Sequence, residues 1–296
     1  MTETPDRNLA LELVRVTEVA AIAAARHQGR GDKEAVDQAA VDAMRQVLST
    51  IDMDGVVVIG EGEKDEAPML YNGEQVGNGS QPMVDVAVDP VDGTRLTARG
   101  MPGALAVIAL APRGTMYAPG SLVYMDKIAV GPAVAGMIDI EAPVADNLSQ
   151  VAKAYDKPVS DVTAIILDRP RNEPFVQAVR AAGARIALIG DGDIQGSIAT
   201  AKSDTGIDIL FGIGGSPEAV TSACAMAALD GEIQAKLWPR DDSERAYAAE
   251  EGLDLDQVLT TRDLVDSDNT FFAATGVTDG ELLQGVRFGS HSVRTN

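Results

Sequence analysis

Short hydrophobic segments alternate with helical segments in the second half of the chain, and this alternation restricts the possible folds more than any other sequence feature. The predicted strands cover 163–168, 185–190 and 208–213. The predicted helices cover 146–156, 173–183, 194–201 and 216–231. Strands that alternate with helices of this length form a parallel or mostly parallel sheet, because each helix returns the chain to the same end of the sheet. The second half is therefore predicted to be an α/β layer.

The first half has a different order of elements. Hydrophobic residues at three- to four-residue spacing predict two long helices, at 8–28 and 34–50, joined through the segment GRGDK. The predicted strands that follow cover 55–60, 84–89, 103–111, 122–130 and 134–140. These strands are expected to form a mixed sheet, so the chain should fold into two abutting layers of helices and sheets with a boundary near 145–160.

Composition and charge exclude several classes of protein. Of the 296 residues, 45% are hydrophobic, and 45 Asp and Glu outnumber 24 Lys and Arg to give a formal charge of −21. A negative field of this size disfavours nucleic acids and anionic membrane surfaces as partners. The start of the chain shows no signal-peptide pattern, and no hydrophobic run reaches the roughly 18 residues of a membrane helix. With a single cysteine, Cys224, and so no internal disulfide, a cytoplasmic protein is expected.

The motif DPVDGT, from Asp89 to Thr94, directly follows a predicted strand and is the strongest indication of chemistry. Pro90 ends the strand, and Gly93 permits a tight turn. Asp89 and Asp92 therefore converge at the end of a strand, where hard divalent cations find oxygen ligands. The amides of Gly93 and Thr94 could hold an anion beside such cations. The alternative interpretation is an ordinary Asp-Gly turn with Asp92 in solvent.

Two further acidic residues could complete this site. Glu61, in IGEGEKDEA, follows the strand predicted at 55–60 and should point into the same crevice, since like charges crowded at strand ends need a cation to neutralise them. Asp32, in GRGDK, precedes the second helix, where it could bind a metal or cap the helix. The sequence leaves both interpretations of Asp32 open.

The motifs GRGDK, IGEGEKD, DPVDGT, YMDKIAVGP and GIGGSPE occur together in this chain. As a set they resemble the class II fructose-1,6-bisphosphatases, within the superfamily of lithium-sensitive, metal-dependent sugar phosphatases. The resemblance extends from residue 6 to residue 296. It implies a layered α-β-α-β-α fold with two abutting sheets. It also implies an N-terminal α+β metal-binding domain, 1–155, and a C-terminal α/β substrate domain, 156–296.

The resemblance also implies a two-metal site, position by position. The first Mg²⁺ or Mn²⁺ is implied to be bound by Asp32 and Glu61, and the second by Asp89, Asp92 and Glu218. Thr94 is implied to orient or help deprotonate the attacking water, and Asp32 or Glu61 could receive its proton. From its neighbours alone, Glu218 is the acidic residue of a helix start with the sequence SPE, and the two interpretations are compatible.

Substrate recognition is expected from the second half of the chain. Arg169 and Arg171 follow a predicted strand, where guanidinium groups suit the remote phosphate of a bisphosphate, although an ordinary charged turn has the same pattern. Asp191 and Asp193 follow the next strand and could bind sugar hydroxyls or cap the helix that comes after. The resemblance implies substrate contacts from Asp92, Gly93, Thr94, Tyr124, Arg169, Pro170, Arg171, Asp191, Gly192, Asp193 and Gly215.

Two residues of the motif YMDKIAVGP have more than one interpretation. Tyr124 alone would be an aromatic residue of a strand in the core. Lys127, on the same predicted strand, could face solvent or phosphate, and the sequence does not decide between them.

The predicted activity is the Mg²⁺- or Mn²⁺-dependent hydrolysis of the 1-phosphate of fructose 1,6-bisphosphate to fructose 6-phosphate by a metal-activated water. The alternatives are a dual enzyme that also hydrolyses sedoheptulose 1,7-bisphosphate, as suggested by relatives in photosynthetic bacteria, a catalytically impaired sugar-phosphate-binding protein, and an inositol- or nucleotide-phosphate phosphatase.

A homo-oligomer, either a dimer or a tetramer, is expected. Family members continue beyond the SVRTN segment, so the C-terminal domain is expected to be truncated, with an unpaired sheet edge near 283–292.

Overall fold

The computed structural model describes residues 7–60 and 70–296, which form two compact units. Unit 1 comprises the described residues of Met1–Met116 and Ser267–Asn296, and unit 2 comprises Tyr117–Asp266. This division differs from the predicted boundary at 155/156, which lies inside unit 2. The C-terminal residues belong to unit 1 because β11 (Phe271–Gly276) pairs along its whole length with β4 (Leu105–Pro112).

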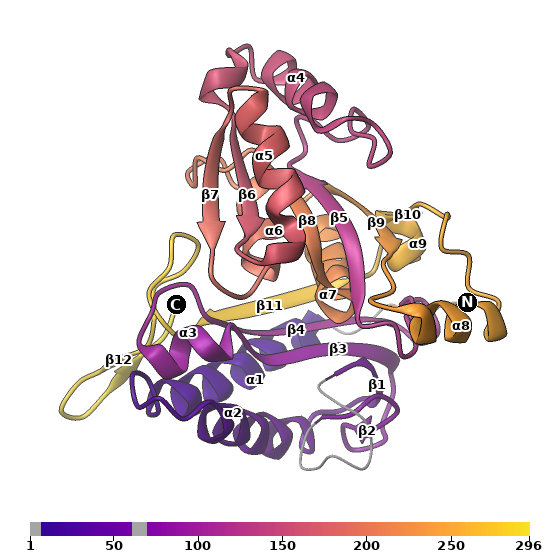
Figure 1. Ribbon diagram of the computed structural model, residues 1–296. Coiled ribbons are helices and arrows are strands. Elements are labelled where there is room, and N and C mark those ends of the chain that lie inside the picture. The colour runs from indigo at the N-terminus through magenta and orange to yellow at the C-terminus, as the bar shows by residue number, and fades with distance from the viewer. Residues whose placement is uncertain (1–6, 61–69) are drawn as a thin grey trace. The chain divides into compact units, whose positions relative to one another are not determined.

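Unit 1 contains, among the described residues, a five-stranded sheet in the order β11-β4-β3-β1-β2 (Figure 1). Its other strands are β1 (Asp54–Ile59), β2 (Gln75–Val76) and β3 (Met83–Asp92). β1 and β3 are parallel, whereas the other pairs are antiparallel. The strands predicted at 55–60, 84–89 and 103–111 are therefore confirmed as members of one mixed sheet.

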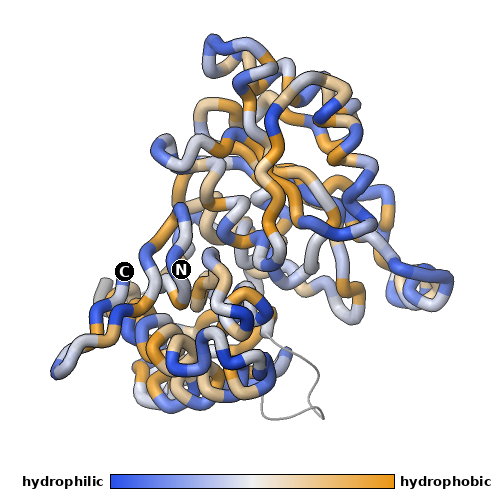
Figure 2. Tube along the Cα trace, turned by 60° about the vertical axis from the view of Figure 1, so that its left-hand side comes forward, coloured by the Kyte–Doolittle hydropathy of each residue, from blue (hydrophilic) through white to orange (hydrophobic). Residues whose placement is uncertain are grey.

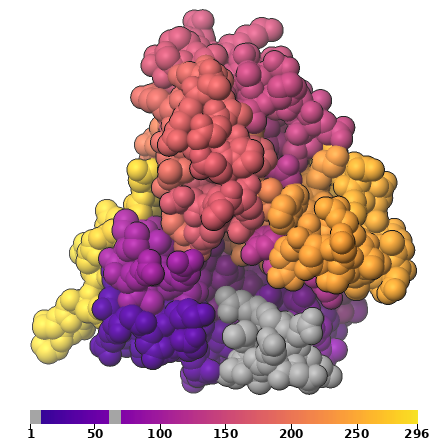
Figure 3. Space-filling view, viewed as in Figure 1, coloured from indigo at the N-terminus to yellow at the C-terminus, as the bar shows by residue number. Residues whose placement is uncertain are grey.

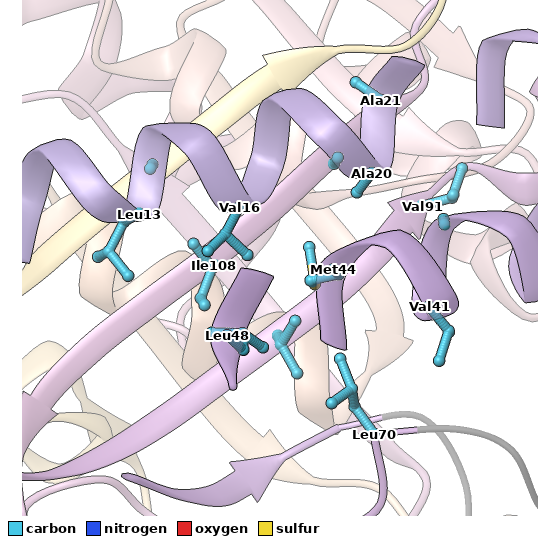
Figure 4. Close-up of a cluster of buried hydrophobic side chains, with 14 of the residues drawn as sticks. Leu13, Val16, Ala20, Ala21, Val41, Met44, Leu48, Leu70, Val91 and Ile108 are labelled. Carbon is cyan, nitrogen blue, oxygen red and sulfur yellow. The ribbon is translucent and has the colours of Figure 1, made fainter. Parts of the chain in front are cut away.

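Two helices of unit 1, α1 (Arg7–Ala25) and α2 (Lys33–Leu48), pack against each other and against this sheet. Their hydrophobic residues recur at helical spacing, so each helix presents one apolar stripe to the core. Figure 4 shows these side chains converging with strand residues. The stripe residues in the core cluster include Leu13, Val16, Ala20, Val41, Met44 and Leu48, together with Ile108 of β4.

Unit 2 contains, in the part of it that the structure describes, a six-stranded sheet in the order β10-β9-β5-β8-β6-β7. β6 is parallel to β7 and β8, as the alternation of strands and helices predicts, whereas β5 is antiparallel to β8 and β9. The predicted α/β class is confirmed. The strands are β5 (Tyr124–Val130), β6 (Thr163–Leu167), β7 (Arg185–Ile189), β8 (Ile209–Gly215), β9 (Glu232–Leu237) and β10 (Leu259–Thr260).

The helices of unit 2 pack on its sheet. Alternate strand residues such as Ile166 and Phe211 join Leu148 of α4 and Val179 of α5 in one hydrophobic cluster. Figure 2 shows the long hydrophobic stretches that run along these strands. None of the helices in the described residues is long and apolar enough to cross a membrane. The helices are α4 (Val144–Ala154), α5 (Glu173–Ala181), α6 (Ile194–Thr200), α7 (Ser216–Ala228), α8 (Asp242–Glu250) and α9 (Thr261–Leu264), with short 3₁₀ turns η1 (Val159–Asp161) and η2 (Pro170–Asn172).

The strand predicted at 134–140 is wrong, because these residues form turns. Their backbone hydrogen bonds go to neighbouring turn residues and to side chains of β9 and α4 instead of a neighbouring strand. The Gln234 side chain donates to the Ile138 carbonyl at 3.0 Å and accepts from the Ile140 amide at 2.8 Å. The backbone of a hydrophobic run can therefore be bonded by side chains distant in sequence, such as Gln234, which periodicity alone does not reveal.

The open edge of the second sheet expected near 283–292 is not observed. Residues around it form the hairpin of β12 (Arg287–Phe288) and β13 (Val293–Arg294), which belongs to unit 1. The end of the chain is held there by hydrogen bonds: the Gly276 amide donates to the Asn296 carbonyl at 2.9 Å, the Gln284 amide donates to Asn296 Oδ1 at 2.9 Å, and the Thr295 hydroxyl donates to Glu18 at 3.0 Å.

The buried carboxylate of Asp85 in β3 holds the turn after β4. Its Oδ2 accepts hydrogen bonds from the amides of Gly114, Thr115 and Met116 at 2.7, 2.9 and 3.1 Å. Arg113 Nε lies 3.6 Å from Asp85 Oδ1. One charged acceptor therefore satisfies three consecutive donors and balances one cation.

Replacing Asp85 with Ala should lower the free energy of unfolding by about 2 kcal/mol or more, because three amides lose a charged acceptor. Urea unfolding monitored by circular dichroism measures this change. The matched control is Glu12→Gln on the exposed side of α1, which should shift stability by less than about 0.5 kcal/mol. An equally small effect for Asp85→Ala would contradict the structural role of this carboxylate.

Candidate functional site

The end of β3 and the start of α3 (Thr94–Arg99) form the candidate site of unit 1. Asp89 and Asp92 are at the end of β3, and only 3% of the Asp92 surface is exposed. Gly93 follows with a φ of 95°, in the left-handed region, and a Cβ there would lie 3.1 Å from Leu96 Cδ1. Glycine therefore allows the strand to turn directly into α3.

The hydroxyl of Thr94 contacts a carboxylate that the sequence did not single out. Thr94 Oγ1 donates to Asp37 Oδ1 at 2.7 Å and lies 3.1 Å from the Val91 carbonyl oxygen. Asp37 is on α2, which packs beside α3 (Figure 3). A signal did exist: Asp37 precedes the buried Ala40 and Val41 by three and four residues, so it lies on the inward stripe of α2.

The other metal ligands predicted in the first half behave differently. Asp32 is exposed and caps α2 by accepting a hydrogen bond from the Ala35 amide at 3.0 Å, which is one of its two expected roles. Glu61 lies outside the described residues. Within residues 7–60 and 70–296, no group of three or more His, Cys, Asp or Glu side chains is arranged to hold a metal ion. The side-chain donors at the end of β3 are oxygens, the type that Mg²⁺ and Mn²⁺ prefer.

In unit 2, the predicted substrate residues meet at one edge of the sheet. β6, β7 and β8 are parallel, so the segments that follow them lie at the same edge. Tyr124 begins β5 at this edge and is paired in register with Gly215. The topology therefore gathers Tyr124, Arg169, Pro170, Arg171, Asp191, Gly192, Asp193, Gly215 and Glu218.

Arg169 connects two of these segments. It donates to the Gly190 carbonyl and to Asp191 Oδ1, both at 2.7 Å. Asp191 was expected either to bind sugar hydroxyls or to cap α6; in the structure its carboxylate pairs with Arg169, and the contact with the sugar stays a prediction.

Arg171 lies on the ring of Tyr124. Its guanidinium carbon is 4.2 Å from the ring centroid, and its Nε donates to the Ile213 carbonyl at 2.9 Å. The Tyr124 ring meets Trp238 edge-on, with centroids 6.2 Å apart. Tyr124 therefore serves as a platform for a cation, in addition to packing against an aromatic neighbour.

Lys127, which the sequence left undecided, is buried on β5. Its Nζ lies 2.6 Å from Asp193 Oδ2 and donates to the Gly215 carbonyl at 3.2 Å. Asp193 occupies the N-cap position of α6 without a side-chain capping bond, so its carboxylate pairs with the lysine instead. A Cβ at Gly214 would overlap the Asp193 carboxylate and lie 2.7 Å from Lys127 Nζ, which explains this glycine in the motif GIGG.

Glu218 lies in the first turn of α7, as predicted. The residue is partly exposed, but its Oε2 is buried and has no hydrogen-bond partner among the described residues. Burial, followed by the charge of Asp193, raises the pKa of Glu218, whereas the charge of Lys127 opposes this rise. A Cβ at Gly215 would overlap the Glu218 carboxylate, so the last glycine of the motif makes room for it.

Comparison with known proteins gives a consistent match. Residues 7–296 match the family model described as bacterial fructose-1,6-bisphosphatase, glpX-encoded. The chain is 46% identical over 294 residues to fructose-1,6-bisphosphatase 1 class 2 of Escherichia coli (strain K12), covering 95% of this chain and 87% of that protein. The fructose-1,6-bisphosphatase class 2 of Shigella flexneri matches with the same identity and coverage. A solved structure, the extragenic suppressor protein suhB from Bartonella henselae, has a TM-score of 0.38 and 16% identity over 67% of this chain and 75% of that chain, a similarity too weak to support an argument.

An α/β fold with carboxylates, a hydroxyl and arginines at its strand ends is consistent with a phosphatase, and the two curated relatives are phosphatases by name. The chain belongs to the family of bacterial class II fructose-1,6-bisphosphatases. The resemblance carried by the motifs is therefore confirmed over nearly the whole chain.

Asp126, the neighbour of Lys127 on β5, has an unusual environment. The pleat of the strand places the two side chains on opposite faces of the sheet. Burial raises the pKa of Asp126 to about 6, against the opposing effects of the Lys127 amide and the Lys236 cation. Its Oδ1 has no hydrogen-bond partner in the part of the chain that the structure describes.

Folding raises the pKa of Asp126 above its ordinary value of 3.8, so the folded state holds this proton more tightly than the unfolded state. The stability of the protein relative to Asp126→Asn should therefore fall as pH rises from about 4 to about 6 and stay constant above that window. At neutral pH the variant should be the more stable protein. Urea unfolding over a pH series tests this, with the exposed Asp204→Asn as control, and a difference independent of pH would contradict it.

Proposed function

We propose that this chain hydrolyses the 1-phosphate of fructose 1,6-bisphosphate to fructose 6-phosphate and inorganic phosphate, with Mg²⁺ or Mn²⁺ bound. The observation that carries the proposal is the hydrogen bond from Thr94 to Asp37 at the acidic end of β3. Family membership supports the substrate, since the matched family is described as a fructose-1,6-bisphosphatase.

The proposed cation ligands are oxygen atoms of acidic side chains. Two bound divalent cations would screen the phosphoryl oxygens and lower the pKa of a bound water. The chemistry of Glu218 suits this role. Its carboxylate oxygen Oε2 is buried, and burial disfavours the charged form of the carboxylate. A bound divalent cation would favour that charged form. The proposed ligands are Asp32 and Glu61 for one cation and Asp89, Asp92 and Glu218 for the other, as the motifs of the family imply.

Thr94 would orient the attacking water. Because its hydroxyl proton points to Asp37, the oxygen lone pairs of Thr94 can accept a hydrogen bond from water. Threonine alone is too weak a base to deprotonate water, so Asp37 would accept the proton through the hydroxyl. In this proposal Asp37 replaces Asp32 and Glu61 as the acceptor, since the Asp32 carboxylate bonds the Ala35 amide.

The sugar and the 6-phosphate would bind at the strand ends of unit 2. The guanidinium of Arg171 is already held by Tyr124 and the Ile213 carbonyl, so little freedom is lost when it meets a phosphate. Arg169 adds a second positive charge beside it. The sugar hydroxyls would contact Pro170, Asp191, Gly192, Asp193 and Gly215.

Thr94→Ala should lower kcat by about 100-fold or more with little change in KM, because the water loses its orienting partner. Asp37→Asn should cause a loss of similar size, and the double variant should be little worse than either, because the two residues act as one unit. Steady-state phosphate release measures these values. Thr50→Ala, at an exposed hydroxyl, is the matched control and should be fully active. Near-normal kcat in Thr94→Ala would remove Thr94 from the mechanism.

A panel of phosphate esters tests the reaction itself. We expect fastest phosphate release from fructose 1,6-bisphosphate when it is compared with sedoheptulose 1,7-bisphosphate, inositol 1-phosphate and 3′-phosphoadenosine 5′-phosphate. Treatment with EDTA should abolish activity, and Mg²⁺ or Mn²⁺ should restore it, because the metals supply the positive charge that the acidic site lacks. Full activity of metal-free protein would contradict the metal role. Equal rates on both bisphosphates would identify a dual enzyme, and binding by calorimetry without release would identify a sugar-phosphate-binding protein.

A further inference from the structure

We propose that Lys127 is a positioning residue, which holds Asp193 and the Gly215 carbonyl in the geometry needed to bind the sugar bisphosphate. This inference rests on the proposed function, because Asp193 and Gly215 are substrate contacts only there. Lys127 itself is not expected to touch the substrate.

The burial of Lys127 is the first observation. Its side chain is 0% exposed, and it is among the largest fully buried side chains of the described residues. A buried ammonium group carries a large desolvation cost, which is offset only when the charge is paired and its hydrogen bonds are made. A methionine or leucine would fill the same space at lower cost, so packing alone does not account for a lysine at this position.

The contacts of Lys127 are the second observation. Its Nζ reaches the Asp193 carboxylate at 2.6 Å and the Gly215 carbonyl at 3.2 Å. Asp193 belongs to the segment between β7 and α6, whereas Gly215 ends β8, and these strands lie on either side of β6. One ammonium group therefore ties together two segments that the sheet alone would not hold at a fixed distance.

The glycine at position 214 is the third observation. Any side chain there would collide with both Lys127 and Asp193, so this pair requires a glycine in the adjacent strand. Gly214 of the motif GIGG and the lysine of YMDK are thus explained by one contact. A second ion pair of unit 2, Lys157–Asp208, is also 2.6 Å long but lies away from this position, and its lysine is partly exposed, so it offers a comparison.

The variants Lys127→Met, Asp193→Asn and their combination test the inference in the full chain. Lys127→Met should raise KM for fructose 1,6-bisphosphate by about tenfold or more while kcat changes less, because positioning of the binding contacts is lost. Asp193→Asn should also raise KM. The double variant should have the KM of Asp193→Asn, because the lysine acts through that carboxylate. Lys157→Met is the matched control, and it should lose stability without a change in KM.

The outcomes separate the two proposals. If the wild-type protein releases no phosphate from fructose 1,6-bisphosphate, the proposed function fails. If the wild-type protein is active and folded Lys127→Met keeps its KM, the positioning role is overturned, and multiplied KM effects in the double variant overturn it as well. Should Lys127→Met not fold, Lys127→Gln keeps a hydrogen-bond donor without the charge and gives the same comparison. A raised KM in folded Lys127→Gln supports the role, and an unchanged KM overturns it.

Discussion

The cost of burying carboxylates in and after the strands is the constraint on which the rest of this structure depends. A carboxylate that leaves water loses its hydration, so each such acid needs a cation or several hydrogen-bond donors. In unit 2, Asp193 is balanced by Lys127 and Asp191 by Arg169. In unit 1, Asp85 is surrounded by three backbone amides. The positions of these partners determine where the loops can lie.

Glycines make this arrangement sterically possible. Gly93 lets β3 turn into α3, and Gly214 and Gly215 leave space for the Asp193 and Glu218 carboxylates. Without a Cβ, the strand backbone can approach charged side chains closely, and helix starts then present those side chains at the sheet edge. The charged groups at these strand ends also explain how a phosphatase with a formal charge of −21 can act on an anionic substrate. Local cations, including the arginines of unit 2, decide the sign of a binding site, whereas net charge governs only long-range behaviour.

Periodicity in the sequence predicted most of the elements, and its failures have physical causes. The helices α1 and α2 and the strands β6 and β8 follow directly from hydrophobic spacing, because each buries a regular stripe or a continuous run. The segment 134–140 has the same hydrophobic character, but turn hydrogen bonds and the side chains of Gln234 and Asn147 take up its backbone groups. β11 joins the sheet of unit 1 although more than a hundred residues separate it from β4. Such strand pairings depend on contacts between distant residues, which a local pattern of hydrophobic residues does not predict.

The sequence by itself determined the family, the α/β class and the motifs at the strand ends. Each of these depends on short runs of contiguous residues, whose chemistry and spacing can be recognised in the sequence alone. Only the tertiary structure decided which groups meet. It paired Thr94 with Asp37 instead of Asp32, because helix packing aligns α2 with the start of α3. It also buried Lys127 against Asp193, because the pleat and register of β5 point that side chain toward α6. Partners so distant in sequence are selected by packing and register, which local composition does not specify.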